Sequence, residues 1–211
     1  MITTLSVGPI GVNVHIVDLG GNQAMIVDPG AEPERILSTL DGRSVVCIAL
    51  THGHLDHTAC IPSLREALGP VPVAVHAADA RYLGARGEET NLRVFMDIGA
   101  RSYFDRYWSP LPEADILLAD GDALPGTRIR VLHTPGHTAG SCCFYIEDDS
   151  ALLAGDTLFR GGLGRTDNFD SSEEAILDSI RRRILVLPPN TKVYPGHGET
   201  TTIAAERPYF L

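Results

Sequence analysis

The sequence predicts an α+β protein, an αββα sandwich in which two mixed β-sheets pack face to face and helices flank them. Strand-like apolar runs followed by a helical segment occur twice, once in each half of the chain. Two sheets and the helices that cover them would bury all of these apolar faces. A length of 211 residues suits one large domain and is short for two. We therefore expect one domain over residues 1–211.

The first half carries the patterns of several strands and two helices. Apolar runs predict strands at 2–7, 12–18, 23–28, 45–50 and 71–76. Gly20, Gly21 and Asn22 supply a hairpin turn between the second and third strands. Pro33 can open a short helix that ends near Leu40, because proline is tolerated at the first helical position. A further helix is expected from about 58 to 68.

The second half repeats this arrangement. Strands are predicted at 129–132, 141–147, 151–154 and 193–194. Ser171 and Glu174 form a capping-box pattern for a helix that runs to about Leu185.

An aromatic segment at about 86–112 separates the two halves. Loops and insertions of this length are often functional. Its aromatic side chains either pack on the sheet or form a lid over a substrate, and the sequence leaves both interpretations open.

The run Thr51-His52-Gly53-His54-Leu55-Asp56-His57 is the most informative stretch of the chain. It places three imidazoles and a carboxylate within six residues. These groups are the usual ligands of a zinc-like ion that keeps an open position for chemistry. One ion cannot easily use all four groups and still admit a substrate, whereas two adjacent ions can. The run therefore indicates a dinuclear hydrolytic site.

Three more metal-ligand side chains follow strand-like runs. His137 comes after the run at 129–132, Asp156 after the run at 151–154, and His197 after the strand at 193–194. Each lies in a glycine-containing turn. Loops at strand ends on a rigid sheet are common places for catalytic groups.

These motifs resemble those of the metallo-β-lactamase superfamily from about Val12 onward. The stretches Gly155-Asp156-Thr157-Leu158-Phe159 and Gly161-Gly162-Leu163-Gly164-Arg165 resemble the glyoxalase II-like branch, the hydroxyacylglutathione hydrolases, and so does Val27-Asp28-Pro29-Gly30. The chain ends at Leu211, soon after His197. It therefore resembles the short form that lacks the C-terminal helical domain.

The resemblance implies a site with two divalent metal ions, zinc by expectation and iron or manganese as alternatives. It assigns the first ion to His52, His54 and His137, the second to Asp56, His57 and His197, and a bridging position to Asp156. Asp56 and Asp156 are the candidate catalytic carboxylates. A hydroxide between the two ions would attack the substrate carbonyl, and a thiolate could leave without a proton donor because a thiol pKa is only about 8.5.

Other residues are candidates for supporting roles. Asp28, at a strand end, and His133, four residues before His137, could hold the ligating histidines from outside. Arg165 is a candidate for binding the substrate, and Tyr107 and Trp108 of the aromatic segment are candidates for covering it.

Composition excludes several functions. A net charge of −10 with no Lys/Arg-rich patch argues against nucleic-acid binding. No apolar run approaches the roughly 18 residues of a membrane span. The four cysteines show no Cys-x-x-Cys spacing, which indicates reduced thiols in a cytoplasmic protein. A small-molecule substrate is the expected partner, and a homo-oligomer remains open.

The expected reaction is hydrolysis of a thioester such as S-lactoylglutathione, with three alternatives. Gly164 to Asp167 also resembles the persulfide dioxygenases, which hold one iron through residues that match His52, His137 and Asp156. A lactonase, or another ester or amide hydrolase, would use the same metals. A non-catalytic binding protein would be expected to have lost ligands, and this chain retains all seven.

Overall fold

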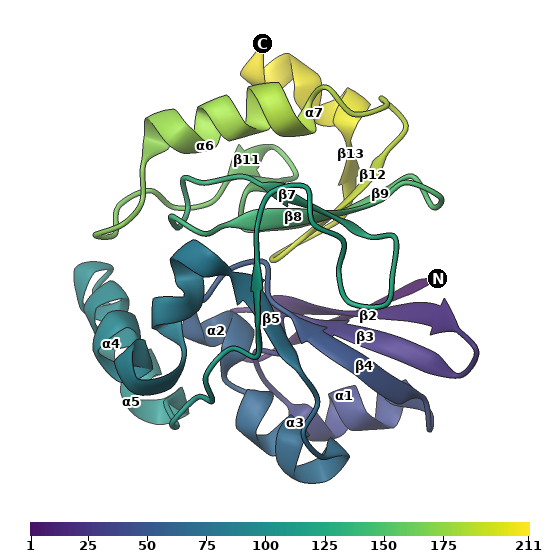
Figure 1. Ribbon diagram of the computed structural model, residues 1–211. Coiled ribbons are helices and arrows are strands. Elements are labelled where there is room, and N and C mark those ends of the chain that lie inside the picture. Colours follow the sequence, from purple (N-terminus) through teal and green to yellow (C-terminus); the bar gives the residue numbers. More distant parts are fainter.

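Two β-sheets lie face to face, and each is covered by helices on its outer side (Figure 1). The computed structural model describes residues 1–211. The αββα sandwich predicted from the sequence is confirmed. Both sheets mix parallel and antiparallel neighbours.

The first sheet has six strands in sequence order. They are β1 (Ile2–Val7), β2 (Val12–Gly20), β3 (Gln23–Val27), β4 (Ser44–Ala49), β5 (Val73–His76) and β6 (Ile116–Leu118). The first three pair antiparallel, and β3 to β6 run parallel. Helices α1 (Pro33–Leu40) and α3 (Ile61–Leu68) cover its outer face.

The second sheet has five strands in the order β13-β12-β9-β8-β7. They are β7 (Arg130–His133), β8 (Cys142–Ile146), β9 (Ala151–Gly155), β12 (Lys192–Pro195) and β13 (Thr201–Thr202). Helix α6 (Glu173–Ser179) continues into a π-helical turn (Ile180–Ile184), and with α7 (Ile203–Phe210) it covers the outer face. A small ribbon of β10 (Leu158–Phe159) and β11 (Gly162–Leu163) follows β9.

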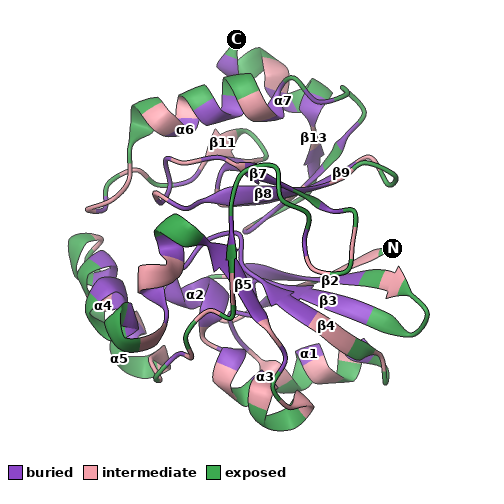
Figure 2. Ribbon diagram, viewed as in Figure 1, coloured by how far each residue is buried: buried purple, intermediate pink, exposed green.

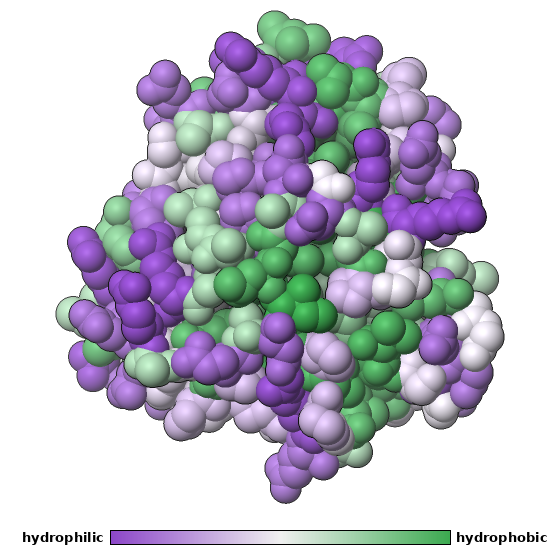
Figure 3. Space-filling view, in the orientation of Figure 1, coloured by the Kyte–Doolittle hydropathy of each residue, from purple (hydrophilic) through white to green (hydrophobic).

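Strand alternation divides the apolar side chains among three layers of core. On β3, Met25 faces the other sheet and Ile26 faces the helices; on β8, Phe144 and Cys143 divide in the same way. The strands are therefore largely buried, while the outer faces of the helices are exposed (Figure 2). Apolar atoms also gather at the centre of one molecular face, and hydrophilic ones predominate over the outer helices (Figure 3).

The helix predicted at 58–68 begins three residues later, as α3 at Ile61, and a separate short helix precedes it. The short helix α2 (Leu55–Thr58) ends before α3 begins, and Pro62 lies in the first turn of α3. Proline has no N–H to donate to the preceding turn and clashes with it. The Cys60 amide, between the two helices, donates to the Pro29 carbonyl at 3.0 Å. The break sets α2 apart as the carrier of two metal-ligand side chains.

The cap of α6 also differs from the prediction. Ser172, not Ser171, accepts a hydrogen bond from the Ala175 amide. The Ser171 hydroxyl is bound to both the amide and the carbonyl of Asn168. The sequence did not predict β6, the β10–β11 ribbon, β13 or α7, because most of these elements are only two or three residues long.

The aromatic segment forms two helices beside the sandwich. Two short 3₁₀ turns (Ala77–Tyr82 and Gly84–Arg86) lead into α4 (Gly87–Asp97), which is followed by α5 (Arg101–Tyr107). Both helices lie at one side of the molecule, next to α2 (Figure 1). No helix of the structure is long and apolar enough to cross a membrane.

Candidate metal centre

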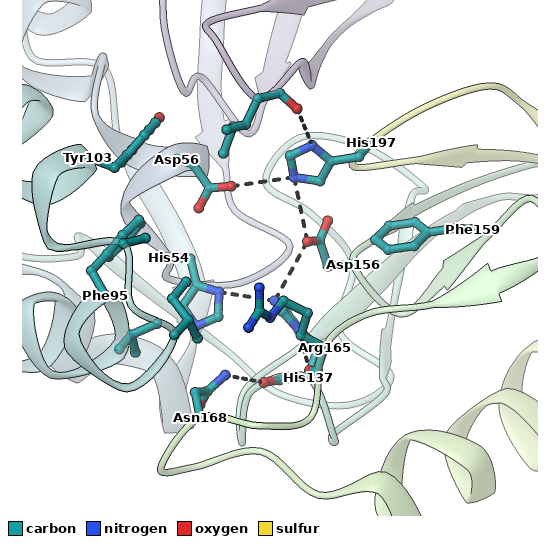
Figure 4. A pocket seen from close by; sticks show the side chains of 14 residues that line it. His54, Asp56, Phe95, Tyr103, His137, Asp156, Phe159, Arg165, Asn168 and His197 are labelled. Atoms are coloured by element: carbon teal, nitrogen blue, oxygen red, sulfur yellow. Dashed lines mark hydrogen bonds and ion pairs between the residues drawn. The ribbon is translucent and has the colours of Figure 1, made fainter.

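Loops at one edge of the two sheets bring the seven predicted metal-ligand residues together. Figure 4 shows His54, Asp56, His137, Asp156 and His197, which line the cavity beside them. His52 and His54 follow β4, and Asp56 and His57 lie on α2. The second sheet supplies the others: His137 between β7 and β8, Asp156 after β9, and His197 after β12. Neither sheet alone carries the full set, so the stacking of the sheets creates the site.

The first group of donors consists of His52, His54 and His137. One nitrogen from each ring lies within 4.8 Å of the others. The closest pair, His54 Nδ1 and His137 Nε2, is 3.0 Å apart. All three residues are buried.

The second group consists of Asp56, His57 and His197, whose donor atoms also lie within 4.8 Å of one another. His57 Nε2 is 3.3 Å from His197 Nε2. Asp56 Oδ2 is 3.4 Å from His197 Nε2 and 3.5 Å from His57 Nε2.

Asp156 lies between the two groups. Its Oδ2 atom is 3.6 Å from His137 Nε2 of the first group and 3.6 Å from His197 Nε2 of the second. Its Oδ1 atom is 3.5 Å from His57 Nε2. One carboxylate is thus within reach of both groups.

Three of the imidazoles are oriented by acceptors outside the cluster. His57 Nδ1 lies 3.1 Å from Asp28 Oδ2, His137 Nδ1 lies 2.8 Å from the Arg165 carbonyl, and His197 Nδ1 lies 3.3 Å from the Ile10 carbonyl. Donation from Nδ1 turns Nε2 inward, where a neutral ring can offer it to a metal ion. Ligating histidines in proteins are usually held in this way.

Asp28 is well fixed for this role. It is fully buried and has a left-handed backbone conformation with φ of 55° where β3 ends. Its Oδ1 accepts from the Thr51 amide at 2.8 Å, and its Oδ2 accepts from the Thr51 hydroxyl at 2.6 Å. The same carboxylate therefore holds the start of the metal-ligand loop and the His57 ring.

The donor set fits divalent cations. His52 Nε2 and Asp156 Oδ1 are buried and have no hydrogen-bond partner within the protein. Buried polar atoms are almost always paired, and a cation would satisfy both. Histidine nitrogens with carboxylate oxygens suit zinc, iron or manganese. Two groups of three donors with a carboxylate between them have room for two such ions.

The protonation of the cluster is also suited to binding cations. Burial, together with the neighbouring imidazoles, lowers the pKa of His52 and of His54 well below the ordinary value, so both rings are neutral ligands. Burial alone would raise the pKa of Asp56, but His57 and His197 outweigh it and lower that pKa. Burial likewise opposes protonation of His57, yet the Asp56, Asp156 and Asp28 carboxylates raise its pKa to about 10. The negative charge that attracts this proton would attract a metal ion in its place.

Asp79, which the sequence analysis missed, links the two sides of the site. It is fully buried, and its carboxylate accepts hydrogen bonds from the Gly53 amide at 3.0 Å, the Thr138 hydroxyl at 2.7 Å and the Gly140 amide at 2.7 Å. Gly53 lies between His52 and His54, and Thr138 follows His137. No local motif marks Asp79, because all three contacts depend on the tertiary fold.

Gly196 has to be a glycine because the backbone passes close to the cluster. A Cβ atom at this position would lie 2.1 Å from Asp156 Oδ1 and 2.8 Å from His57 Cε1. Any side chain there would displace the carboxylate that lies between the two donor groups.

A cavity of about 450 Å³ opens beside the donors. Asn168 and Arg165 line it, and Arg165 is held by Asp167, with the Nε–Oδ1 distance 2.9 Å. Tyr107 and Trp108, the expected covering residues, are not part of the lining. Trp108 stacks on Phe104 with ring centroids 5.2 Å apart. Other residues of α4 and α5 line the cavity instead.

His133 does not support the site as the sequence suggested. Its ring stacks on His76 with centroids 4.0 Å apart, and its Nε2 lies 3.0 Å from the Ala139 carbonyl. It is the last residue of β7, and its ring contacts His76 of β5 and the Ala139 carbonyl rather than a member of the donor cluster. A spacing of four residues brings two side chains together on a helix but not across a turn.

The fold and the clustered donors together place this protein in the class of metal-dependent hydrolases. The family profile of the Metallo-beta-lactamase superfamily matches residues 7–197, and the chain belongs to that superfamily.

Several bacterial proteins resemble the chain over nearly their whole length. An uncharacterized protein of Aquifex aeolicus is 38% identical, covering 99% of this chain and 95% of the relative. The probable metallo-hydrolase YqgX of Bacillus subtilis is 31% identical, covering 96% of this chain and 92% of the relative. The hydroxyacylglutathione hydrolase GloC of Haemophilus influenzae is 32% identical, covering 87% and 84%.

Solved structures with the same fold superpose on this chain over nearly its whole length. The B3 metallo-beta-lactamase BLEG-1 superposes with a TM-score of 0.87 at 30% identity, covering 100% of this chain and 98% of that one. TTHA1623, solved in a di-iron-bound form, superposes with a TM-score of 0.80 at 35% identity, covering 97% and 96%.

Proposed function

We propose that this protein hydrolyses thioesters with two bound divalent metal ions, in the manner of the glyoxalase II-like enzymes. S-lactoylglutathione is the first substrate to test. The likeness to a hydroxyacylglutathione hydrolase supports the substrate class. The observation that carries the proposal is chemical: the cavity combines donors for two ions with no side chain acidic enough to protonate a leaving group.

The titratable side chains in the lining support this reading. Apart from the clustered donors, only Tyr103 and Arg165 can titrate. Burial, together with the charge of Asp56, raises the pKa of Tyr103 above its ordinary value. The hydrogen bond to Asp167 raises that of Arg165. Both groups are therefore poor acids at neutral pH. An amine or alkoxide needs a proton to leave, whereas a thiol with a pKa of about 8.5 can leave as the thiolate.

The roles of the residues follow from their positions. His52, His54 and His137 would hold one ion, Asp56, His57 and His197 the other, and Asp156 both. When bound, the ions would supply a nucleophile by bringing the pKa of water to about 7, and would polarise the carbonyl. The water oxygen bonds to the carbonyl carbon, the carbon–sulfur bond breaks, and the products are a carboxylate, a thiol and one proton released to solvent.

Zinc is the proposed metal. Imidazole and carboxylate ligands with open positions are typical of catalytic zinc sites. Iron is the alternative, because TTHA1623 holds two irons on a similar fold. Elemental analysis of the protein as isolated should find about two transition-metal ions per chain, as in other two-metal hydrolases.

The test is hydrolysis of S-lactoylglutathione by the metal-loaded protein and by His57→Ala and His197→Ala. Each variant lacks one of the three donors of the second group, so it should fail to bind the second metal ion and should lose most of the activity. His133→Ala is the matched control, because it removes an imidazole outside the cluster. Full turnover by both cluster variants would contradict the two-metal proposal.

Other outcomes would identify another reaction. Hydrolysis of a lactone but not of the thioester, relative to the metal-free protein, would replace the thioesterase with a lactonase. One tightly bound iron, together with oxygen uptake on glutathione persulfide, would indicate a dioxygenase.

A further inference from the structure

One side of the cavity is a continuous apolar surface. It is formed by Val94, Phe95, Ile98, Ala100 and Tyr103, which lie on α4, on α5 and in the turn between them. We call these five residues the apolar wall. Ile98, Ala100 and Tyr103 are half-buried and present their surface to the cavity, while Val94 and Phe95 are buried behind them. Phe95 and Tyr103 lie on one side of the metal donors, and Phe159 lies on the opposite side (Figure 4).

The apolar wall is held in place before any substrate binds. The rings of Phe95 and Tyr103 stack with centroids 5.2 Å apart and planes at 6°. Tyr107 packs behind Tyr103 with a centroid distance of 4.5 Å. The Tyr103 hydroxyl is the only polar side-chain atom of the wall, and it is buried without a partner. A preformed aromatic surface of this kind binds apolar groups at a low entropic cost.

Positive charge is scarce in the cavity. Arg165 is the only cationic side chain of the lining outside the metal donors, and it is already paired with Asp167 through two contacts of 2.7 and 2.9 Å. Arg93 of α4 lies over the Phe169 ring, 4.1 Å from its centroid. Arg101 of α5 is paired with Asp105 at 2.8 Å. The lining therefore offers no cation without an acidic partner to hold the carboxylates of a charged substrate arm.

We propose that the apolar wall is a subsite for an uncharged apolar arm of the substrate, an aryl or branched alkyl group next to the scissile carbonyl. The inference rests on the thioester hydrolysis proposed above and narrows its substrate class. The arm belongs to the acyl group or to the thiol, and the experiment below separates the two. The inference also predicts that a glutathione thioester is a poorer substrate than an apolar one with the same acyl group.

The test compares matched thioesters on the metal-loaded protein. S-propanoyl-N-acetylcysteamine is the small reference. S-(3-phenylpropanoyl)-N-acetylcysteamine places a phenyl ring on the acyl side. S-lactoyl-2-phenylethanethiol places it on the thiol side and is compared with S-lactoylglutathione. For at least one phenyl compound, kcat/KM should exceed that of its partner by about tenfold or more, the discrimination expected of an apolar pocket.

Charge substitutions show whether the apolar wall causes this preference. Ile98→Lys places a cation on the wall and should reduce the phenyl preference by about tenfold. Met96→Lys, in the last turn of α4 two residues before Ile98, is the matched control, because Met96 is exposed and lies outside the lining. It should leave both the preference and the basal activity unchanged. Equal effects of the two variants would remove the wall from substrate recognition.

A binding measurement on the wild-type protein makes the inference testable without turnover and without variants. Calorimetry with the metal-loaded protein should show 4-phenylbutyrate binding about tenfold more tightly than butyrate. Equal affinities would overturn the apolar subsite even if thioesters are hydrolysed. If the phenyl compound binds more tightly but no thioester is hydrolysed, the apolar subsite is supported and the proposed reaction is refuted.

Discussion

Replacing Asp28 with asparagine should weaken the second metal group selectively. Asp28 Oδ2 accepts from both the Thr51 hydroxyl and His57 Nδ1, at 2.6 and 3.1 Å. An asparagine that keeps its oxygen on the Thr51 amide must present its NH₂ group to His57. His57 then has to accept at Nδ1 and carry its proton on Nε2, the atom that faces Asp56 and Asp156. A protonated Nε2 cannot bind a metal.

The size of the effect follows from this geometry. One hydrogen bond between an imidazole and a buried carboxylate is lost, and bonds to charged groups contribute about 1.5–3 kcal/mol. At about 1.4 kcal/mol per tenfold in an equilibrium constant, this is a loss of roughly 10- to 150-fold in metal affinity. Losses of about 10- to 100-fold are typical when such outer partners are mutated. Asp28 has no hydrogen bond to a member of the first group, although its donor atom lies within 4.8 Å of that of His52, so the first group should lose less affinity than the second.

The assay is a chelator-competition titration of the metal-free protein, combined with elemental analysis. Asp18→Asn is the matched control, because Asp18 is exposed on the neighbouring strand, and its carboxylate contacts only the Gly20 amide at 2.8 Å and Arg43 at 3.8 Å, both away from the metal donors. Wild type and Asp18→Asn should show the same two affinities. If Asp28→Asn keeps both affinities, or loses both equally, the tautomer argument is wrong.

Four further outcomes are expected. Asp156→Ala should bind less metal and melt earlier than any single-histidine variant, because it removes the carboxylate between both groups; unchanged metal content would exclude it as a ligand. Chelation should lower Tm while the far-UV circular dichroism is retained. Burial raises the pKa of Asp79 from 3.8 to about 6, so the folded protein favours the protonated carboxyl. The stabilisation from this preference is present below about pH 4 and is lost as the pH rises through 6. Over that range the metal-free wild type should lose about 3 kcal/mol of unfolding free energy relative to Asp79→Asn, at 1.36 kcal/mol per pKa unit. Arg165→Ala should leave kcat unchanged and raise KM for S-lactoylglutathione by no more than about fivefold, because the exposed guanidinium is already paired with Asp167 and contributes little to binding.

The elements that the sequence predicted well have strong local signals. Pro33 opens α1, and the helix ends at Leu40 as the pattern indicated. Apart from β6 and β13, the strands of both sheets were predicted from their apolar runs. Their side chains alternate between the two faces of the sheet, as at Cys142 and Cys143. The metal-ligand motifs could be located because each follows such a strand. The metal-ligand residues lie close together because these strands end at the same edge of the two sheets.

The parts that were missed depend on tertiary contacts. Asp79 has no neighbour in sequence that hints at its three hydrogen bonds. On α5, Tyr103 and Tyr107 lie one turn apart, and only the docking of the helix decides that Tyr103 faces the cavity. The sequence therefore identified the aromatic segment and could not identify which of its residues face the substrate.

The arrangement of the site also indicates that the fold does not depend on metal. Thirteen buried apolar residues form the core between the two sheets, and none of them is a metal donor. Hydrogen bonds also join the sheets beside the donors: Cys142 donates to the Thr51 carbonyl at 2.8 Å, and the Asn13 amide donates to the Gly196 carbonyl at 2.6 Å. In small zinc domains the metal replaces a missing core, so removal unfolds them. Here the stacked sheets place the donors first. The unpaired buried nitrogen of His52 and the neighbouring carboxylates of Asp56 and Asp156 destabilise the fold locally. The larger core offsets this destabilisation, and bound cations would remove it.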